Sequence, residues 1–308
     1  MSGAGIQPAR RCEHTGAEPK LLAVFDEYRI GMVSGHGIVD ISECFQGWRP
    51  AATAIRDCIA EWPTVSGRVD QMISSGRLLD LAEIHLRPPV PEPRNLLCAP
   101  VNYHEHRGEV TMDRRGEATA TADVRDRGFF VKSISSIVGP GDPIELPPLE
   151  QREFAYEGEV ALVVGSPLRG RVDPNRAWDY VFGLTGFVDV TLRPSETRIE
   201  ERSMRKSYHS FGPLGPWIMV TETEPDVDSI ALELTVNGIT RQSALLGDLI
   251  TPIPGLLSSA SQVLPLTPGD VFATGTPSGV GPLAAGDVVT LHVCPIGEMS
   301  LTVTEREW

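Results

Sequence analysis

The 308-residue sequence predicts an α+β fold that is rich in strands. Short apolar runs separated by Gly, Pro and Asp turns recur through residues 95–304, and this pattern is typical of strands. Helix-like spacing of apolar residues appears in 51–84 and again in 250–263. Strands and helices do not alternate regularly, which argues against a doubly wound or barrel fold built on a parallel sheet.

The first part of the chain, residues 1–90, is predicted to form a small N-terminal α/β domain. We expect its polar leading segment, 1–18, to be flexible, and from Leu21 apolar runs flank a Ser-Gly-His-Gly turn that fits a hairpin. The stretch RPPVPEPR at 87–94 has four prolines in eight residues, which neither a helix nor a central strand accommodates. We therefore place a domain boundary there, with the main domain at 95–306.

The main domain is predicted to consist mostly of strands. Asn237-Gly238 lies between two strand-like segments and is a residue pair favoured in two-residue hairpin turns. The predicted strand regions are 95–101, 129–132, 156–165, 181–188, 216–221, 230–241, 270–273 and 287–304.

Composition excludes several classes of function. The 41 acidic and 27 basic residues give a net charge of −14, which argues against nucleic acid or an anionic membrane as the main partner. The five cysteines are scattered and form no C-x-x-C pair, so neither a disulfide framework nor a thiolate zinc site is indicated. No signal-like apolar segment opens the chain, and no apolar run approaches membrane-spanning length. We expect a soluble, cytoplasmic protein.

The segment YEGEVALVVG at 156–165 places two acids in an otherwise apolar strand. Side chains alternate between the faces of a strand, so Glu157 and Glu159 share a face. Their repulsion at about 6–7 Å is on the order of 2–3 kcal/mol at an effective dielectric of about 20. A solvent-exposed edge would relieve it and is the commoner arrangement for such a pair. A bound divalent cation is the alternative.

Other candidate residues lie in separate motifs. Asp189 in GFVDVTLRP has apolar neighbours, so it needs either a metal ion or a partner such as Arg193, and the two readings stay open. His106 and Glu109 in NYHEHRGE would lie on one face of a helical turn, as in a general-base pair, although such spacing is common in polar loops. The glycine-rich ATGTPSGVG at 273–281 lacks the lysine of a phosphate-binding loop.

The order of the motifs resembles that of the fumarylacetoacetate hydrolase family over roughly residues 95–304. The resemblance implies a homodimeric enzyme with the mixed, β-rich fold of that family's C-terminal domain. It also implies a divalent cation, Mg²⁺ or Mn²⁺ and in some members Ca²⁺, held by Glu157, Glu159 and Asp189. The motifs that carry it are NYHEHRGE, FFVKSISSIVGPGDPIELP, YEGEVALVVG, YVFGLTGFVDVTLR, RKSYHSFGPLGPW, VNG, PGDVFATGTPSGVG and AGDVV.

The same resemblance implies a hydrolase that cleaves a carbon-carbon bond in a 1,3-dicarbonyl acid. A histidine-glutamate dyad on a lid would activate water, and a lysine and a threonine would stabilise oxyanion charge. A decarboxylase or an isomerase (tautomerase) on the same site is the alternative, and a noncatalytic binding protein is a more remote one. By motif position the residues are His106 and Glu109 of the dyad, the catalytic Lys206, and the substrate-binding Arg193, Thr276 and Lys132.

Three positions depart from the family pattern. Pro194 and Glu196 stand where most members have Asp and Gln, and His209 replaces the Asp of a K-S-F-D motif. The Gln position helps to hold the substrate in the family, and Glu196 there would repel a carboxylate unless it were protonated. We therefore expect a bulkier or less anionic dicarbonyl substrate than the small dicarboxylates, with Glu196 at the substrate site.

Overall fold

A computed structural model describes residues 18–111 and 123–307, with the side chains of 109–111 outside the description. No helix in this described part is long and apolar enough to cross a membrane. The helices are α1 (Ala54–Ser75), α2 (His104–Thr111), α3 (Val124–Arg127), α4 (Arg202–Arg205) and α5 (Ile253–Val263). The strands are β1 (Leu21–Phe25), β2 (Arg29–Ser34), β3 (Gly37–Asp40), β4 (Leu78–Asp80), β5 (Leu86–Arg87), β6 (Leu96–Cys98), β7 (Phe130–Val131), β8 (Ile137–Val138), β9 (Ile144–Leu146), β10 (Phe154–Tyr156), β11 (Gly158–Val164), β12 (Val181–Val188), β13 (Thr191–Leu192), β14 (Gly212–Val220), β15 (Ala231–Val236), β16 (Ile239–Leu245), β17 (Val271–Ala273), β18 (Gly281–Leu283), β19 (Val288–Cys294) and β20 (Gly297–Glu305).

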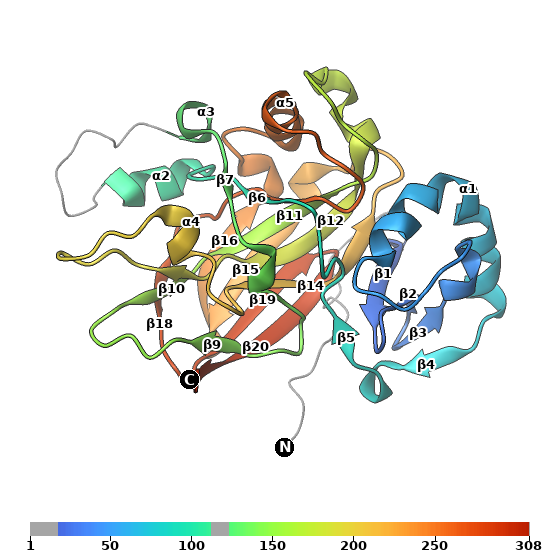
Figure 1. The fold of residues 1–308 in the computed structure, drawn as a ribbon, viewed down its shortest axis with the longest axis horizontal. Helices are drawn as coiled ribbons and strands as arrows, with labels where there is room; N and C mark the ends of the chain where they lie inside the picture. Colours follow the sequence, from blue (N-terminus) through green and yellow to red (C-terminus); the bar gives the residue numbers. More distant parts are fainter. Residues whose placement is uncertain (1–17, 112–122, 308) are drawn as a thin grey trace.

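Three sheets organise the fold. The largest has the strand order β4-β3-β2-β1-β14-β12-β11-β17-β6-β7, with β5 beside β1 and β8 beside β14. A five-stranded sheet, β16-β15-β19-β20-β9, packs against one face of it, and a short sheet contains β13-β10-β18. Helices α2, α3 and α4 lie on the same side of the molecule (Figure 1). Mixed sheets with few helices confirm the predicted α+β class.

The N-terminal segment forms a lobe at one side of the molecule, with α1 lying over β1 to β3 (Figure 1). Strand β1 pairs with β14 through Leu21 and Met219, so the large sheet is continuous across the boundary proposed at 87–94. The division into 1–90 and 95–306 therefore stays a prediction.

Helix α1 ends earlier than the apolar spacing predicts. A Cβ atom on Gly76 would lie 2.4 Å from Val39 Cγ1, so glycine permits the close approach at which the chain leaves the helix. Leu79 then pairs with Ile38 in the β3–β4 ladder. The helical expectation is wrong for 78–80, which form β4, because pairing with β3 outweighs the local apolar spacing; 81–83 form a single 3-10 turn.

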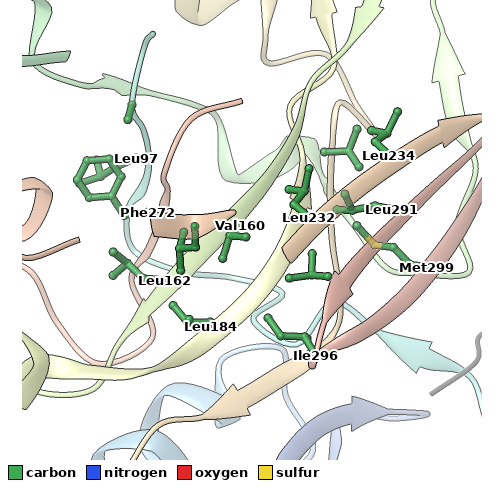
Figure 2. Packing of buried hydrophobic residues seen from close by; sticks show 14 of the residues in the cluster. Leu97, Val160, Leu162, Leu184, Leu232, Leu234, Phe272, Leu291, Ile296 and Met299 are labelled. Carbon is green, nitrogen blue, oxygen red and sulfur yellow. The ribbon is translucent and has the colours of Figure 1, made fainter. Parts of the chain in front are cut away.

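The alternation predicted for 156–165 is confirmed, because alternate side chains of β11 belong to two different cores, one on each face of the strand. Val160 and Leu162 belong to the core between the large and five-stranded sheets, together with Leu232 and Leu291 (Figure 2). Ala161 and Val163 belong to a second core on the other face. That core includes Trp62 of α1, whose ring lies 5.4 Å from that of Phe182.

Several other predictions are confirmed. The predicted helix at 250–263 matches α5, and the hairpin turn has positive φ at both Asn237 (53°) and Gly238 (75°), which suits asparagine and glycine.

Cys44, Cys58 and Cys98 are free and buried. Cys294 is disulfide-bonded, which the scattered cysteines do not predict.

Candidate metal centre and active site

Three buried carboxylates form the centre of the candidate site. Oxygen atoms of Glu157, Glu159 and Asp189 lie within 4.8 Å of one another. The three residues are 7%, 2% and 1% exposed. Strand β11 lies between β12 and β17, so the solvent-exposed edge favoured by the segment alone is wrong.

The acids converge because strands change sheet at this point. Glu157 separates β10 from β11, and Asp189 follows β12 shortly before β13. The chain therefore passes from the short sheet into the large one at Glu157, and from the large sheet into the short one at Asp189. The backbone N–H of Asp189 donates to the Glu157 carbonyl at 2.8 Å, which fixes the two residues opposite each other.

The glycine-rich loop is the third place where the chain passes between these two sheets, here from β17 of the large sheet to β18 of the short one. The N–H of Gly275 donates to Glu159 Oε2 at 2.8 Å. Gly275 has φ of 104°, and a Cβ atom there would lie 2.8 Å from Asn102 Cβ, so glycine is required for this approach. Among the described hydrogen bonds, Glu159 accepts none from a lysine or an arginine.

Three cations contact the other two acids. Lys206 Nζ donates to Glu157 Oε2 at 2.8 Å and to Asp189 Oδ2 at 2.6 Å. Lys132 Nζ donates to Asp189 Oδ1 at 2.5 Å and is fully buried. Arg193 Nη2 donates to Glu157 Oε1 at 2.9 Å. The suggested pairing of Arg193 with Asp189 is therefore not formed.

The surrounding charges shift the pKa values of the two glutamates in opposite directions. Burial alone would raise the pKa of Glu157, but Lys206 and Arg193 outweigh it and hold this pKa below its usual value. For Glu159, burial together with Asp189 and Glu157 raises the pKa well above its usual value. A divalent cation would offset this repulsion, and three carboxylate oxygens are a donor set that fits a hard cation.

The two lysines also differ. Burial alone would lower the pKa of Lys206, but Asp189 and Glu157 raise it above its usual value, which favours a permanent charge. Burial lowers the pKa of Lys132 despite its contact with Asp189. Sequence alone treats a lysine as a surface residue, and only the motif resemblance pointed to these two.

The proposed dyad lies on α2. His106 is 8% exposed, and it is close enough to the acids for its charge to add to the effect of Lys206 and Arg193 on the pKa of Glu157. The Glu109 side chain lies outside the described residues, as do 112–122 of the expected lid. Ser278 of the glycine-rich loop donates to Glu105 at 2.9 Å and links that loop to α2.

Gln242 is a site residue that the sequence analysis missed. It is buried on β16, where its Nε2 donates to Thr276 Oγ1 at 2.8 Å and its Oε1 accepts from Gly158 N–H at 2.8 Å. Thr276 in turn donates its hydroxyl to the Gly158 carbonyl at 2.9 Å. A glutamine in a polar strand carries no special signal, so only the fold reveals this contact.

Among the described hydrogen bonds and ion pairs, none joins the three departing positions to the acids. Glu196 and Pro194 are exposed on the segment after β13. His209 is also exposed, and its Nδ1 lies 3.2 Å from Glu145 Oε2. The expectation that Glu196 lies at the substrate site therefore stays a prediction.

Comparison with known proteins identifies the family. Residues 95–304 match the model described as the C-terminal domain of fumarylacetoacetate hydrolase. The chain belongs to the fumarylacetoacetate hydrolase family. It is therefore an enzyme of this family, whose members in the comparison include hydrolases, tautomerases and isomerases.

Among these family members, a maleylpyruvate hydrolase of Aquipseudomonas alcaligenes is 32% identical over 91% of this chain and 97% of its own length. An oxaloacetate tautomerase of Bacillus subtilis is 32% identical over 72% of this chain and 74% of its own. The solved maleylpyruvate hydrolase of a Sphingobium species, in complex with Mn²⁺ and pyruvate, has a TM-score of 0.81 and 34% identity. That comparison covers 93% of this chain and all of the other.

Proposed function

We propose that this enzyme is a divalent-metal-dependent hydrolase that cleaves a carbon-carbon bond in a 1,3-dicarbonyl acid. The observation that carries the proposal is the buried cluster of Glu157, Glu159 and Asp189 with His106 beside it. The maleylpyruvate hydrolases, which match more than nine-tenths of the chain, support the reaction class.

The three acids would hold the cation, either Mg²⁺ or Mn²⁺, with Ca²⁺ as an alternative. When bound, it would polarise a carbonyl group of the substrate and stabilise enolate charge. Arg193 and Lys132 lie beside these acids and would orient the anionic end of the substrate.

The protein groups would supply the proton transfers. His106, oriented by Glu109, would take a proton from water, and the resulting hydroxide would attack the carbonyl carbon. Lys206 would stabilise the oxyanion, and its raised pKa keeps it charged for this task. The carbon-carbon bond then breaks to give a carboxylic acid and an enolate, which takes the proton back from His106. Thr276 would hold the substrate, after its hydroxyl leaves the Gly158 carbonyl.

Hydrolysis in ¹⁸O-labelled water tests the proposal. Purified Mn²⁺-loaded enzyme and an acylpyruvate should give one carboxylate product that contains a solvent oxygen. Product without label would reject hydrolysis and favour decarboxylation or tautomerisation. The tautomerase of Bacillus subtilis makes proton transfer at carbon the second candidate, because it needs only the base and the cation.

We also propose a cytoplasmic homodimer, acting in the breakdown of small keto acids, with no nucleic-acid or membrane partner. The net charge of −14 and the three free cysteines support this assignment, whereas the disulfide of Cys294 is the observation against a reducing compartment. Light scattering of the purified protein tests the dimer, and mass spectrometry after thiol alkylation in intact cells tests the redox state of Cys294.

A further inference from the structure

Arg152, shortly before β10, is a buried arginine that has no part in the chemistry proposed above. Its guanidinium holds Glu200 by two hydrogen bonds, from Nη1 to Oε1 at 2.7 Å and from Nη2 to Oε2 at 2.9 Å. Nη2 also donates to the backbone carbonyl of Arg193 at 2.9 Å. The Arg152 and Glu200 side chains are only 8% and 7% exposed. One planar group therefore joins Glu200 to the arginine that donates to Glu157 of the acid cluster.

Stability alone does not account for this buried ion pair. Removal of two charges from water costs free energy that their attraction only partly repays, and apolar residues of the same volume often stabilise a protein as well or better. Arg152 Nε is also buried without a hydrogen-bond partner among the described residues, which adds to the cost. What the pair does supply is geometry, because the rigid fork of a guanidinium fixes the directions of all the oxygens that it contacts.

The segment that follows Arg193 has few other bonds to hold it in place. Pro194 has no N–H to donate, and the described backbone N–H groups of 195–200 donate only within that segment. On its other side, the Arg193 N–H donates to the Glu153 carbonyl at 2.8 Å. Without Arg152, the Arg193 carbonyl would lose its only described donor, and one end of this residue would be released.

We propose that Arg152 is a positioning residue that, through Glu200 and the Arg193 carbonyl, keeps the Arg193 guanidinium at Glu157, where it can receive the substrate carboxylate. This inference rests on the proposed function, in which Arg193 orients the anionic end of the substrate. No described hydrogen bond or ion pair joins Arg152 to the acid cluster. Its effect on substrate binding therefore passes through Arg193, which distinguishes it from a second ligand for the substrate.

Binding of pyruvate, a small acid with a carboxylate next to a ketone, tests the proposal without a cleavage step. Titration calorimetry with Mn²⁺-loaded protein measures the Kd. Arg152→Met should raise the pyruvate Kd about tenfold or more, as the loss of an outer partner of a site residue does. The Mn²⁺ Kd should stay within about twofold, because the three acids keep their own contacts.

Two further variants separate the geometry of Arg152 from its charge and from folding. Arg152→Lys keeps the charge, but one ammonium group cannot reproduce the fork, so its pyruvate Kd should also rise. Arg198→Met is the matched control, because Arg198 pairs with the same Glu200 carboxylate at 2.9 Å but its side chain makes no described bond to Arg193. Its pyruvate Kd should equal that of the unsubstituted protein.

A double-variant cycle distinguishes positioning from a general loosening of the site. If Arg152 acts through Arg193, Arg152→Met in the Arg193→Met background should change the pyruvate Kd by less than about twofold. Losses that multiply would indicate a structural role and overturn the proposal. A crystal structure of Arg152→Met gives an answer that needs no ligand, because Arg193 Nη2 should have left Glu157 Oε1. Retention of that contact would also overturn the proposal.

An unchanged pyruvate Kd in Arg152→Met, or no pyruvate binding by the unsubstituted protein, would equally reject Arg152 as a positioning residue. The proposed hydrolase is judged separately, by the solvent label in the carboxylate product. Pyruvate binding that depends on Arg152 through Arg193, in a protein that cleaves no dicarbonyl acid, would support this inference and reject the hydrolase instead.

Discussion

Lys132 Nζ lies 2.5 Å from Asp189 Oδ1, and neither side chain is more than 1% exposed. A charged lysine with no access to water is stable only because a carboxylate faces it. Asp189 also contacts Lys206, so two buried lysines share one buried acid. Without a metal ion, the stability of the site therefore depends on the pairing of these lysines with the buried acids.

Lys132→Met should therefore destabilise the metal-free protein by about 3 kcal/mol, at the lower end of the range for breaking a buried pair, because Lys206 still faces Asp189. Urea unfolding followed by circular dichroism measures this free energy. The control is Lys20→Met, which removes a partly exposed lysine paired with Asp70 and Glu222, and its cost should be about 0–1 kcal/mol. Equal losses in the two variants would contradict the buried pairing.

Substitution of the acids should abolish metal binding without unfolding the chain. Glu159→Gln should weaken Mn²⁺ binding by more than the roughly 10- to 100-fold typical of altering an outer partner of a ligand. Electron paramagnetic resonance of free Mn²⁺ measures the affinity. Glu145→Gln, at the exposed pair with His209, is the control and should bind as the unsubstituted protein does. Unchanged affinity in Glu159→Gln would remove Glu159 from the ligand set.

His106→Ala should lower kcat by about 10²- to 10⁴-fold, the usual contribution of a general base, and leave Mn²⁺ affinity nearly unchanged. His104→Ala is a matched control, because His104 is an exposed histidine on the same helix. Steady-state kinetics on a confirmed substrate measure both variants. If the two behave alike, His106 is not the base.

Gln242→Met should leave the Gly158 N–H and Thr276 without their partner, at a cost of about 1–3 kcal/mol in unfolding free energy. Gln242→Glu keeps an acceptor for Gly158 but loses the donor to Thr276, so it should raise KM more than it affects stability. Gln262→Met, at an exposed position of α5, should stay within about 0.5 kcal/mol. Wild-type KM in Gln242→Glu would show that the bond to Thr276 does not matter for substrate.

Glu200 should contribute to acid sensitivity. Arg152 donates to both of its carboxylate oxygens and lowers the pKa of Glu200 from 4.5 to about 2. A lowered folded-state pKa gives stability that is complete above 4.5 and lost as the pH falls toward 2. Glu200→Gln should therefore show a shallower decline in unfolding free energy between these pH values. Glu224→Gln, at an exposed site, is the control, and a decline that is the same in all three proteins would reject the assignment.

Local patterns predicted much of the fold. Alternation in 156–165 gave both faces of β11 correctly, and Asn237-Gly238 gave the hairpin between β15 and β16. The end of α1 was not predictable, because it depends on pairing with β3, which is remote in sequence. Burial of Glu157 and Glu159 was not predictable from the segment either, since whether a strand is central is a property of the sheet.

The candidate site came from motif order rather than from spacing. The resemblance identified Lys206 and Lys132 as site residues, and both lysines donate hydrogen bonds to Asp189 in the structure. It could not supply Gln242, because the significance of that residue lies in contacts that depend on tertiary packing. Motif order also places Glu196 at the substrate site, and this stays a prediction, since the structure shows only that the side chain is exposed.

The crossing of strands between the two sheets has a consequence for how this enzyme could change. A one-residue insertion between Glu157 and β11, or between β12 and Asp189, would shift that acid out of register with the large sheet and disassemble the cluster. The segments on α2 and α4 are not bound by such a register, so they can lengthen or exchange residues while the cation ligands stay in place. New substrates for this scaffold should therefore arise by changes in those segments, with the chemistry at the crossing left intact.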